Sequence, residues 1–375
     1  MHVVIFIAGL LVVLTTWASL VATLVLPRGR TLFQRGSWLV VRTVQKAFVA
    51  AARVLPGYEA KDALLAVVGP AALLAQLAAF LGFFALGGWL MLWPWSGAYG
   101  LAFRQSVAAL LTVGLDHVGG PTNDAVLVAI AVSGAVTIAL QIGYLPVLYQ
   151  AFARRETLVT LMESRAGIPA WGPEVLMRHQ LVRTLDELPP FYRDWELWAA
   201  DVAESHSTYS ALLMFRSPEA GYSWLLSLLA VLDAAALQLA LCPTAAPSQA
   251  RMCLRMGFTT LRRMARTLGW HYDPDPSPDG DIDLRYDEFA SAVAQIAEVG
   301  FPVERTAEEA WPHFVGWRVN YESIAYRLAD FLVAPHAPWS GPRRHLPPDV
   351  VPPDRPPHRA PGGVVHDAQR FRPQS

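Results

Sequence analysis

Three long apolar runs dominate the pattern of hydrophobic and polar positions. Residues 3–26 hold no charged side chain over 24 positions, and residues 63–93 and 125–150 form two further runs without a charge. At about 1.5 Å per residue, a helix over each run is long enough to cross about 30 Å of hydrocarbon. The pattern therefore predicts three membrane-spanning helices. A signal peptide is the alternative for the first run, but that run is longer than a signal core and no basic segment precedes it.

Residues 31–55 combine apolar and basic positions. Basic side chains recur at helical spacing among Leu, Val, Phe and Trp, at Arg35, Arg42, Lys46 and Arg53. This pattern is typical of a basic amphipathic helix at a membrane surface. A helix packed on a cytosolic domain would show the same pattern, so both interpretations stay open.

The distribution of basic residues predicts an orientation. Seven Lys or Arg residues lie between the first two runs, and Arg154 and Arg155 follow the third, whereas residues 94–124 contain only Arg104. Loops rich in Lys and Arg stay in the cytoplasm. We therefore expect a multi-pass protein of the cell membrane, with its N-terminus outside and its C-terminal part in the cytoplasm.

The segment between the second and third runs has an unusual order. Residues 101–111 predict a short helix, the sequence TVGLD (112–116) follows, and a Gly/Pro/Asn turn leads into the third run. This order is typical of a re-entrant pore loop. Irregular backbone at membrane depth is tolerated only where it is buried in protein or lines a water-filled cavity. Alone, TVGL is also an ordinary β-prone tetrapeptide, and its position favours the pore interpretation.

At this point the chain resembles a bacterial potassium-channel-like family, since TVGLD is similar to the filter sequence TVGYG. In that family a membrane helix ending in VLPR, here residues 25–28, precedes a two-helix pore module, and a helical cytosolic domain follows. Further similar segments are IGYLPVLYQAFARRE (142–156), the Arg165-Ala166-Gly167 turn, WAADVAESHSTY (198–209), FRSPEAGYSWL (215–225), WPHFVGWRVNYE (311–322) and APW (337–339). The resemblance implies a homotetramer in the lipid bilayer, with K⁺ as the permeating ion and no other cofactor.

The resemblance also implies roles for the filter residues. Thr112 would give its hydroxyl and carbonyl to the innermost ion site, and Val113, Gly114 and Leu115 would give carbonyls that replace the hydration shell of the ion. Leu115 stands where the family has an aromatic residue, and Asp116 stands where it has glycine. A non-glycine residue in left-handed geometry costs about 1–2 kcal/mol. In another alignment, Asp116 is the acidic residue that follows the filter. The filter is degenerate in both, so strict potassium selectivity is not expected.

The third run contains candidate hinge residues. Gly134 and Gly143 interrupt the large side chains, and Pro146 removes one i→i−4 hydrogen bond. Small residues also allow close helix packing in lipid. The sequence favours neither role.

Residues 154–334 predict a helical cytosolic domain. Residues 222–242 are apolar enough for a fourth span, but a mid-membrane charge such as Asp233 costs roughly 2.5–3.5 kcal/mol. We therefore expect a buried core helix there. The predicted helices lie near 174–186, 193–212, 222–241, 248–268, 286–299 and 307–333.

Composition narrows the function classes. The net charge is −1 and only 16% of residues are charged, against about 25% in soluble domains. A neutral balance argues against bulk nucleic-acid binding. The two cysteines form no disulfide framework, and no GxSxG, P-loop or HExxH motif occurs, so no enzyme is expected. Residues 275–286 imitate a calcium loop, but Tyr286 replaces the bidentate Glu, so an acidic linker is expected and no metal site.

These expectations combine into one organisation, that of an all-α membrane protein with three transmembrane helices and a re-entrant pore loop. Its function would be passive cation conduction. The alternative is a non-conducting membrane scaffold or sensor with an unidentified cytosolic partner. The predicted parts are an N-terminal transmembrane helix (1–30), a basic amphipathic helix (31–61), a pore module (62–153), a helical cytosolic domain (154–334) and a disordered tail (335–375) with 11 of the 29 prolines.

Overall fold

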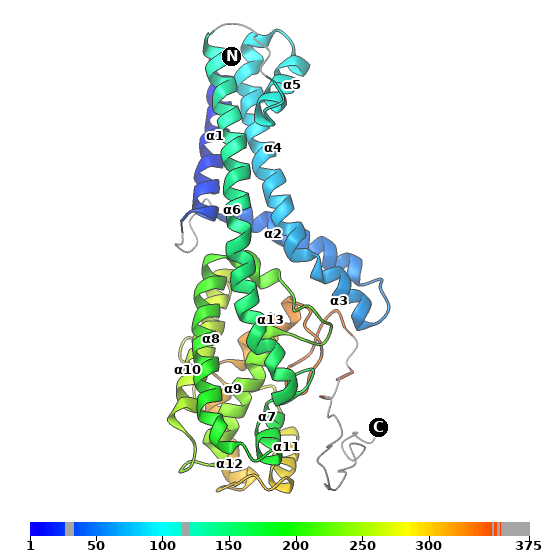
Figure 1. Cartoon of the computed structure of the whole chain (residues 1–375), viewed down its shortest axis with the longest axis vertical. Helices are drawn as coiled ribbons and strands as arrows, with labels where there is room; N and C mark the ends of the chain where they lie inside the picture. Colours follow the sequence, from blue (N-terminus) through cyan, green and yellow to red (C-terminus); the bar gives the residue numbers. More distant parts are fainter. Residues whose placement is uncertain (27–33, 115–120, 347–348, 351–352, 354–375) are drawn as a thin grey trace. The chain divides into compact units, whose positions relative to one another are not determined.

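The computed structural model describes residues 1–26, 34–114, 121–346, 349–350 and 353, and these residues form helices and loops without any strand (Figure 1). The chain divides into two units. We call residues 1–54 and 67–150 the N-terminal unit, and residues 55–66 and 151–375 the C-terminal unit.

Four apolar helices are long enough to cross a membrane in the part of the chain described. They are His2–Leu24, Tyr58–Ser96, Pro121–Ala166 and Trp224–Leu241. The fold is all-helical, and the presence of several such helices indicates a membrane-embedded protein. The first three coincide with the three apolar runs of the sequence.

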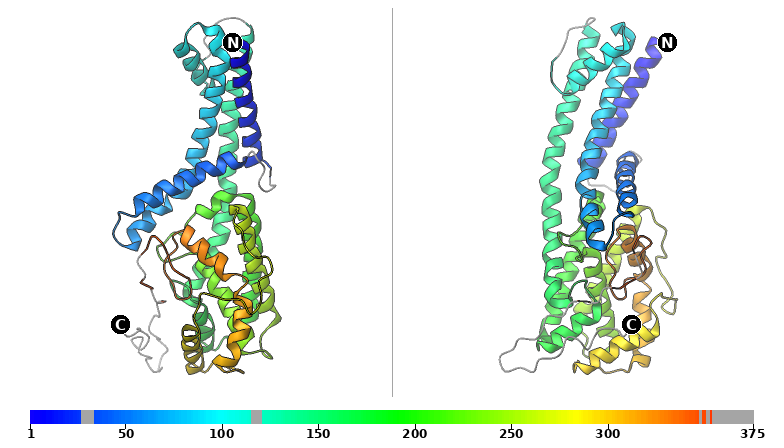
Figure 2. Two further views of the ribbon diagram at one scale, coloured as in Figure 1. Left: turned by 180° about the vertical axis from the view of Figure 1, so that it is seen from behind. Right: turned by 90° about the vertical axis from the view of Figure 1, so that its right-hand side faces the viewer.

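The N-terminal unit is built around α4 (Val68–Ser96). Helix α1 (His2–Leu24) runs beside α4 in both views of Figure 2, and a Cβ atom on Gly9 would lie only 2.7 Å from the carbonyl oxygen of Gly87. The other elements are α2 (Gln34–Ala52), α5 (Tyr99–Leu110) and the first part of α6 (Pro121–Ala166). The Trp17 indole N–H of α1 donates a hydrogen bond to the Ser133 hydroxyl of α6, at 2.9 Å. Apolar side chains from α1, α4, α5 and α6 form one core.

The basic segment at 31–61 is not one helix. Helix α2 ends at Ala52, and α3 (Tyr58–Ala66) begins after a turn in which Gly57 has a φ of +70°. This left-handed conformation suits glycine and interrupts a continuous helix. Helix α3 is tied into the C-terminal unit, because the guanidinium of Arg216 donates to Asp62 Oδ1 (2.7 Å) and to the Tyr58 hydroxyl (2.6 Å).

The C-terminal unit surrounds one apolar helix. Every residue of α9 (Trp224–Leu241) except Leu239 is buried, so the prediction of a buried helix at 222–242 is confirmed. Its neighbours include α7, α8, α10, α12 and α13. The remaining elements are the end of α6, α7 (Gly172–Leu181), η1 (Leu185–Glu187), α8 (Leu188–Thr208), η2 (Ser210–Met214), α10 (Ser248–Leu268), α11 (Tyr286–Glu298), α12 (Ala307–Arg318) and α13 (Glu322–Phe331).

Two sequence predictions are wrong in this unit. The helix predicted over 307–333 is two helices, because the Asn320 amide donates to the carbonyls of Gly316 and Trp317 and ends α12. The predicted tail 335–375 begins too early, since Trp339 and Arg343 are buried in the unit. Residues 354–375 lie outside the described residues.

Candidate pore segment

Helix α5 packs tightly against α4 (Figure 1). The fully buried Ser106 hydroxyl donates a 2.8 Å hydrogen bond to the Ala85 carbonyl oxygen of α4. A Cβ atom on Gly88 would lie 2.4 Å from Ser106 Oγ, so only glycine allows this approach. The short helix after the second apolar run is therefore held against that run through a polar contact between backbone and hydroxyl.

The C-terminal end of α5 packs against α6. A Cβ atom on Gly134 would lie 2.1 Å from the carbonyl oxygen of Leu110, the last residue of α5. This contact supports the packing role of Gly134. At Gly143 a Cβ atom would meet nothing within 4 Å, and α6 continues through Pro146 as one helix to Ala166.

Thr112 ends α5 in a Schellman motif. The Val113 N–H donates to the Ala108 carbonyl (2.9 Å), and the Thr112 N–H donates to the Ala109 carbonyl (3.0 Å). This pattern requires a left-handed residue, and Thr112 has a φ of +55°. Its hydroxyl donates to the Leu111 carbonyl at 2.8 Å. A β-branched residue therefore occupies a position that usually belongs to glycine.

The structure places three of the five predicted filter residues. Thr112, Val113 and Gly114 follow α5 directly, and the side chain of Val113 is 79% exposed in the single chain. Leu115 and Asp116 lie outside the described residues. Gly134 of α6 lies against the last residue of α5, just before this segment. Gly143 and Pro146 belong to later turns of α6.

Buried glutamines are the polar feature that the sequence analysis overlooked. Gln76 of α4, Gln105 of α5 and Gln141 of α6 are each at most 6% exposed, and each has a buried amide atom without a hydrogen-bond partner. A buried polar atom without a hydrogen-bond partner is costly, so each of these amides lowers the stability of the packed unit. For Gln76 and Gln141 the signal in the sequence was an amide inside an otherwise apolar run, whereas Gln105 follows Arg104 outside the runs.

Arg318 is the centre of the polar core in the C-terminal unit. Its buried guanidinium donates to Asp233 Oδ1 on α9 (2.5 Å), to Glu322 Oε1 (2.7 Å) and to the Tyr326 hydroxyl (2.8 Å) on α13. Asp233 also accepts from the Tyr321 hydroxyl at 2.7 Å. The charge that argued against a fourth span is therefore paired inside the domain.

A second buried cation lies where α6 enters the C-terminal unit. Arg155 donates to Glu156 Oε1 (2.7 Å), to the carbonyls of Leu212 and Phe215, and to His206 Nε2 (3.1 Å). Complete burial holds the pKa of His206 well below its usual value, and the charge of Arg155 lowers it further. His206 is therefore neutral near pH 7, with its proton on Nδ1 beside the Ser205 hydroxyl.

The described residues give no group that could hold a metal ion, and both cysteines are buried. Among the described residues, no three His, Cys, Asp or Glu side chains lie where they could hold a metal ion. In the segment that imitates a calcium loop, the backbone N–H groups of Asp283 and Leu284 donate to the Glu322 carboxylate. Burial raises the pKa of Cys242 to about 11 and raises that of Cys253 as well, so both thiols stay protonated.

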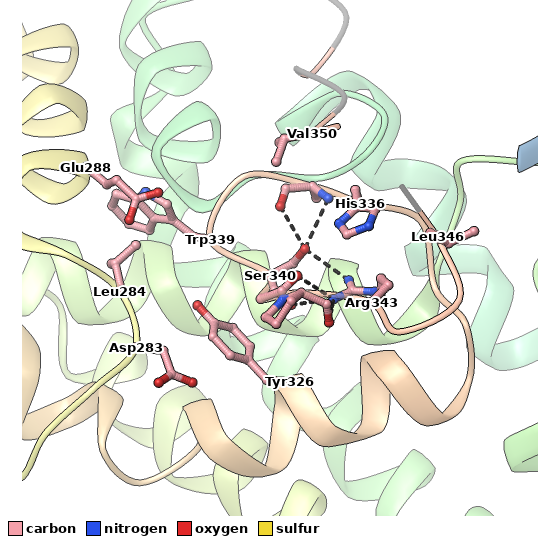
Figure 3. A pocket seen from close by; sticks show the side chains of 13 residues that line it. Asp283, Leu284, Glu288, Tyr326, His336, Trp339, Ser340, Arg343, Leu346 and Val350 are labelled. Carbon is pink, nitrogen blue, oxygen red and sulfur yellow. Dashed lines mark hydrogen bonds between the residues drawn. The ribbon is translucent and has the colours of Figure 1, made fainter. Parts of the chain in front are cut away.

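A cavity of about 340 Å³ adjoins the segment that follows α13 (Figure 3). Ser340 Oγ accepts from the Ala337 N–H and donates to the Ala337 carbonyl, and Arg343 donates to Ser340 Oγ and to several carbonyls. Burial lowers the pKa of Arg343 to about 10. Backbone oxygens already accept hydrogen bonds from the Arg343 guanidinium, so the role of Arg343 in lining this cavity is structural.

Comparisons with family models, with curated proteins and with solved structures find no match to this chain. The likeness to potassium channels therefore depends on the motifs quoted above. The geometry around α5 is the remaining basis for a functional proposal.

Proposed function

We propose that this chain is one subunit of a homotetrameric, potassium-channel-like pore that conducts cations passively across the cell membrane. The observation that carries the proposal is the packing of α5 between α4 and α6, through Ser106 and Gly134. In the proposed topology α1, α4 and α6 span the bilayer, the N-terminus lies outside, and the C-terminal unit lies in the cytoplasm. Helix α9 remains in the domain core, because Arg318 pairs with Asp233 there.

Four copies of the segment after α5 would surround the ion path. Their carbonyl oxygens would replace the hydration shell of K⁺, as in other carbonyl filters. The exposure of Val113 and Thr112 in the single chain supports a position against other copies. The departures at Leu115 and Asp116 lead us to propose weak discrimination between K⁺ and Na⁺.

Recording from the full-length protein in planar bilayers tests the proposal. We expect cation currents in both K⁺ and Na⁺, and a higher K⁺/Na⁺ permeability ratio when Leu115→Tyr and Asp116→Gly are combined. Leu74→Tyr on an exposed face of α4 is the matched control and should leave the ratio unchanged. Mass measurement of the protein in lipid should give four copies. A monomer, or tetramers without current in either ion, would contradict the proposal.

A non-conducting scaffold or sensor is the second candidate. It is favoured by the Thr112 hydroxyl, which is turned to Leu111 as part of the α5 cap. A stable tetramer that stays silent in both ions would support this candidate.

A further inference from the structure

A cavity of about 410 Å³ lies within the N-terminal unit, between α1, α2 and α4. Its volume falls in the range of about 300–1,000 Å³ typical of ligand pockets. The lining residues include Thr15, Thr16, Ser37, Gln76, Ala79 and Phe83, and none of the residues that line it carries a charge. Phe83 and the lining residue Leu39 are exposed, so the cavity opens at the surface of the helices.

Gln76 is a lining residue of this cavity whose side-chain amide is uncommitted. Its side chain is 4% exposed, and its Nε2 atom has no hydrogen-bond partner. The hydroxyl protons nearby are already used, since Thr15 and Thr16 both donate to carbonyls of α1. Ser37 shares a hydrogen bond with Thr23. An occupant that matches this wall is therefore an apolar chain with one hydrogen-bond acceptor.

We propose that the cavity binds one acyl chain of a membrane phospholipid, and that the Gln76 amide turns its buried Nε2 toward the occupant and donates a hydrogen bond to the ester carbonyl oxygen. A phospholipid supplies an apolar chain, an ester oxygen and an anionic phosphate in one molecule. Arg42 and Lys46 follow the lining residues Leu39 and Val40 on α2, and their charge suits the phosphate. The proposal depends on the membrane embedding of these helices and is independent of ion conduction.

Photolabelling of the full-length protein in lipid nanodiscs tests the site. The probe is a phospholipid with a photoreactive group on its acyl chain, and the labelled peptides of α1, α2 and α4 are quantified. Ala79→Phe fills the cavity, and Ala78→Phe places the same side chain on an exposed neighbour that does not line it. We expect labelling of the cavity peptides to fall about tenfold in the first variant and to stay unchanged in the second.

Gln76→Leu tests the hydrogen bond separately. Loss of one donor should lower probe occupancy about fivefold without blocking the cavity. If Ala79→Phe does not fold, Gly36→Leu replaces it, because a Cβ atom there meets nothing within 4 Å. Equal labelling in the filled and control variants would overturn the proposal. It would also be overturned if filling the cavity changed the number of copies in the particle but not the labelling, since a second copy would then occupy the cavity.

The labelling and the recording fail independently. Loss of current with intact labelling would contradict the pore and leave the lipid site in place. Unchanged labelling in the filled variant together with a normal current would contradict the lipid site and leave the pore in place.

Discussion

Thr112 combines a β-branched side chain with a left-handed backbone at the end of α5. Glycine avoids this strain but loses more conformational freedom on folding. We predict that Thr112→Gly raises the free energy of unfolding by about 1 kcal/mol, measured by thermal unfolding of the full-length protein in lipid. Val113→Gly, one residue further, has no left-handed φ to relieve and should give no gain. A loss of stability in Thr112→Gly would show that the assembled protein does not use this cap.

The sequence revealed the glutamines and the TVGLD segment but not what surrounds them in the fold. Glutamine inside an apolar run is visible at Gln76 and Gln141, but the missing hydrogen-bond partners depend on which helices pack together. In the same way, TVGLD suggests a filter by its letters, whereas the hydrogen bonds that turn Thr112 into a helix cap appear only in three dimensions.

The junction of α5 and α6 allows the two candidate roles of the α6 glycines to be separated. A side chain at Gly134 would collide with the Leu110 carbonyl, whereas a side chain at Gly143 meets open space. We predict that Gly134→Val destabilises the protein by about 1–3 kcal/mol and that Gly143→Val changes stability by about 0.5 kcal/mol or less. Thermal unfolding in lipid measures both. Equal stability of the two variants, with altered opening in both, would instead favour hinges.

Helix order was the most predictable part of the fold. The periodicity of apolar positions and the length of the runs without a charge located α1, α4, α6 and the short α5. Both signals depend on local sequence alone. The breaks at Gly57 and Asn320 were missed, since a φ of +70° and an amide turned onto its own helix leave no trace in hydrophobic periodicity. The prolines after residue 334 suggested disorder, yet Trp339 packs edge-on against Phe314. Proline content alone does not prevent a segment from packing.

Acid sensitivity of the C-terminal unit follows from its buried histidines. His206 faces the Arg155 guanidinium on α6, the Ser205 hydroxyl and the Trp224 ring, and its pKa in the folded protein lies well below 6.5. The unfolded chain therefore binds more protons than the folded one below about pH 6.5. Stability is fully present above that pH and is lost as the pH falls.

We predict that His206→Gln flattens the fall in unfolding temperature between pH 7 and pH 5.5, measured on the full-length protein. Some slope remains, because burial also lowers the pKa of His179. His271→Gln, at an exposed position, is the control and should keep the original slope. An unchanged slope in His206→Gln would mean that the folded domain accommodates the imidazolium.

At the scale of the whole molecule, the segment after α13 limits how far the chain can be shortened. The Trp339 carbonyl accepts from buried Arg318, and Arg343 donates to the carbonyls of Ala334 and Pro335. A chain cut at residue 334 would leave the central guanidinium one acceptor short and would uncover the rings beside it. A trimmed version of this protein that keeps a well-packed domain must therefore retain the residues through Arg343.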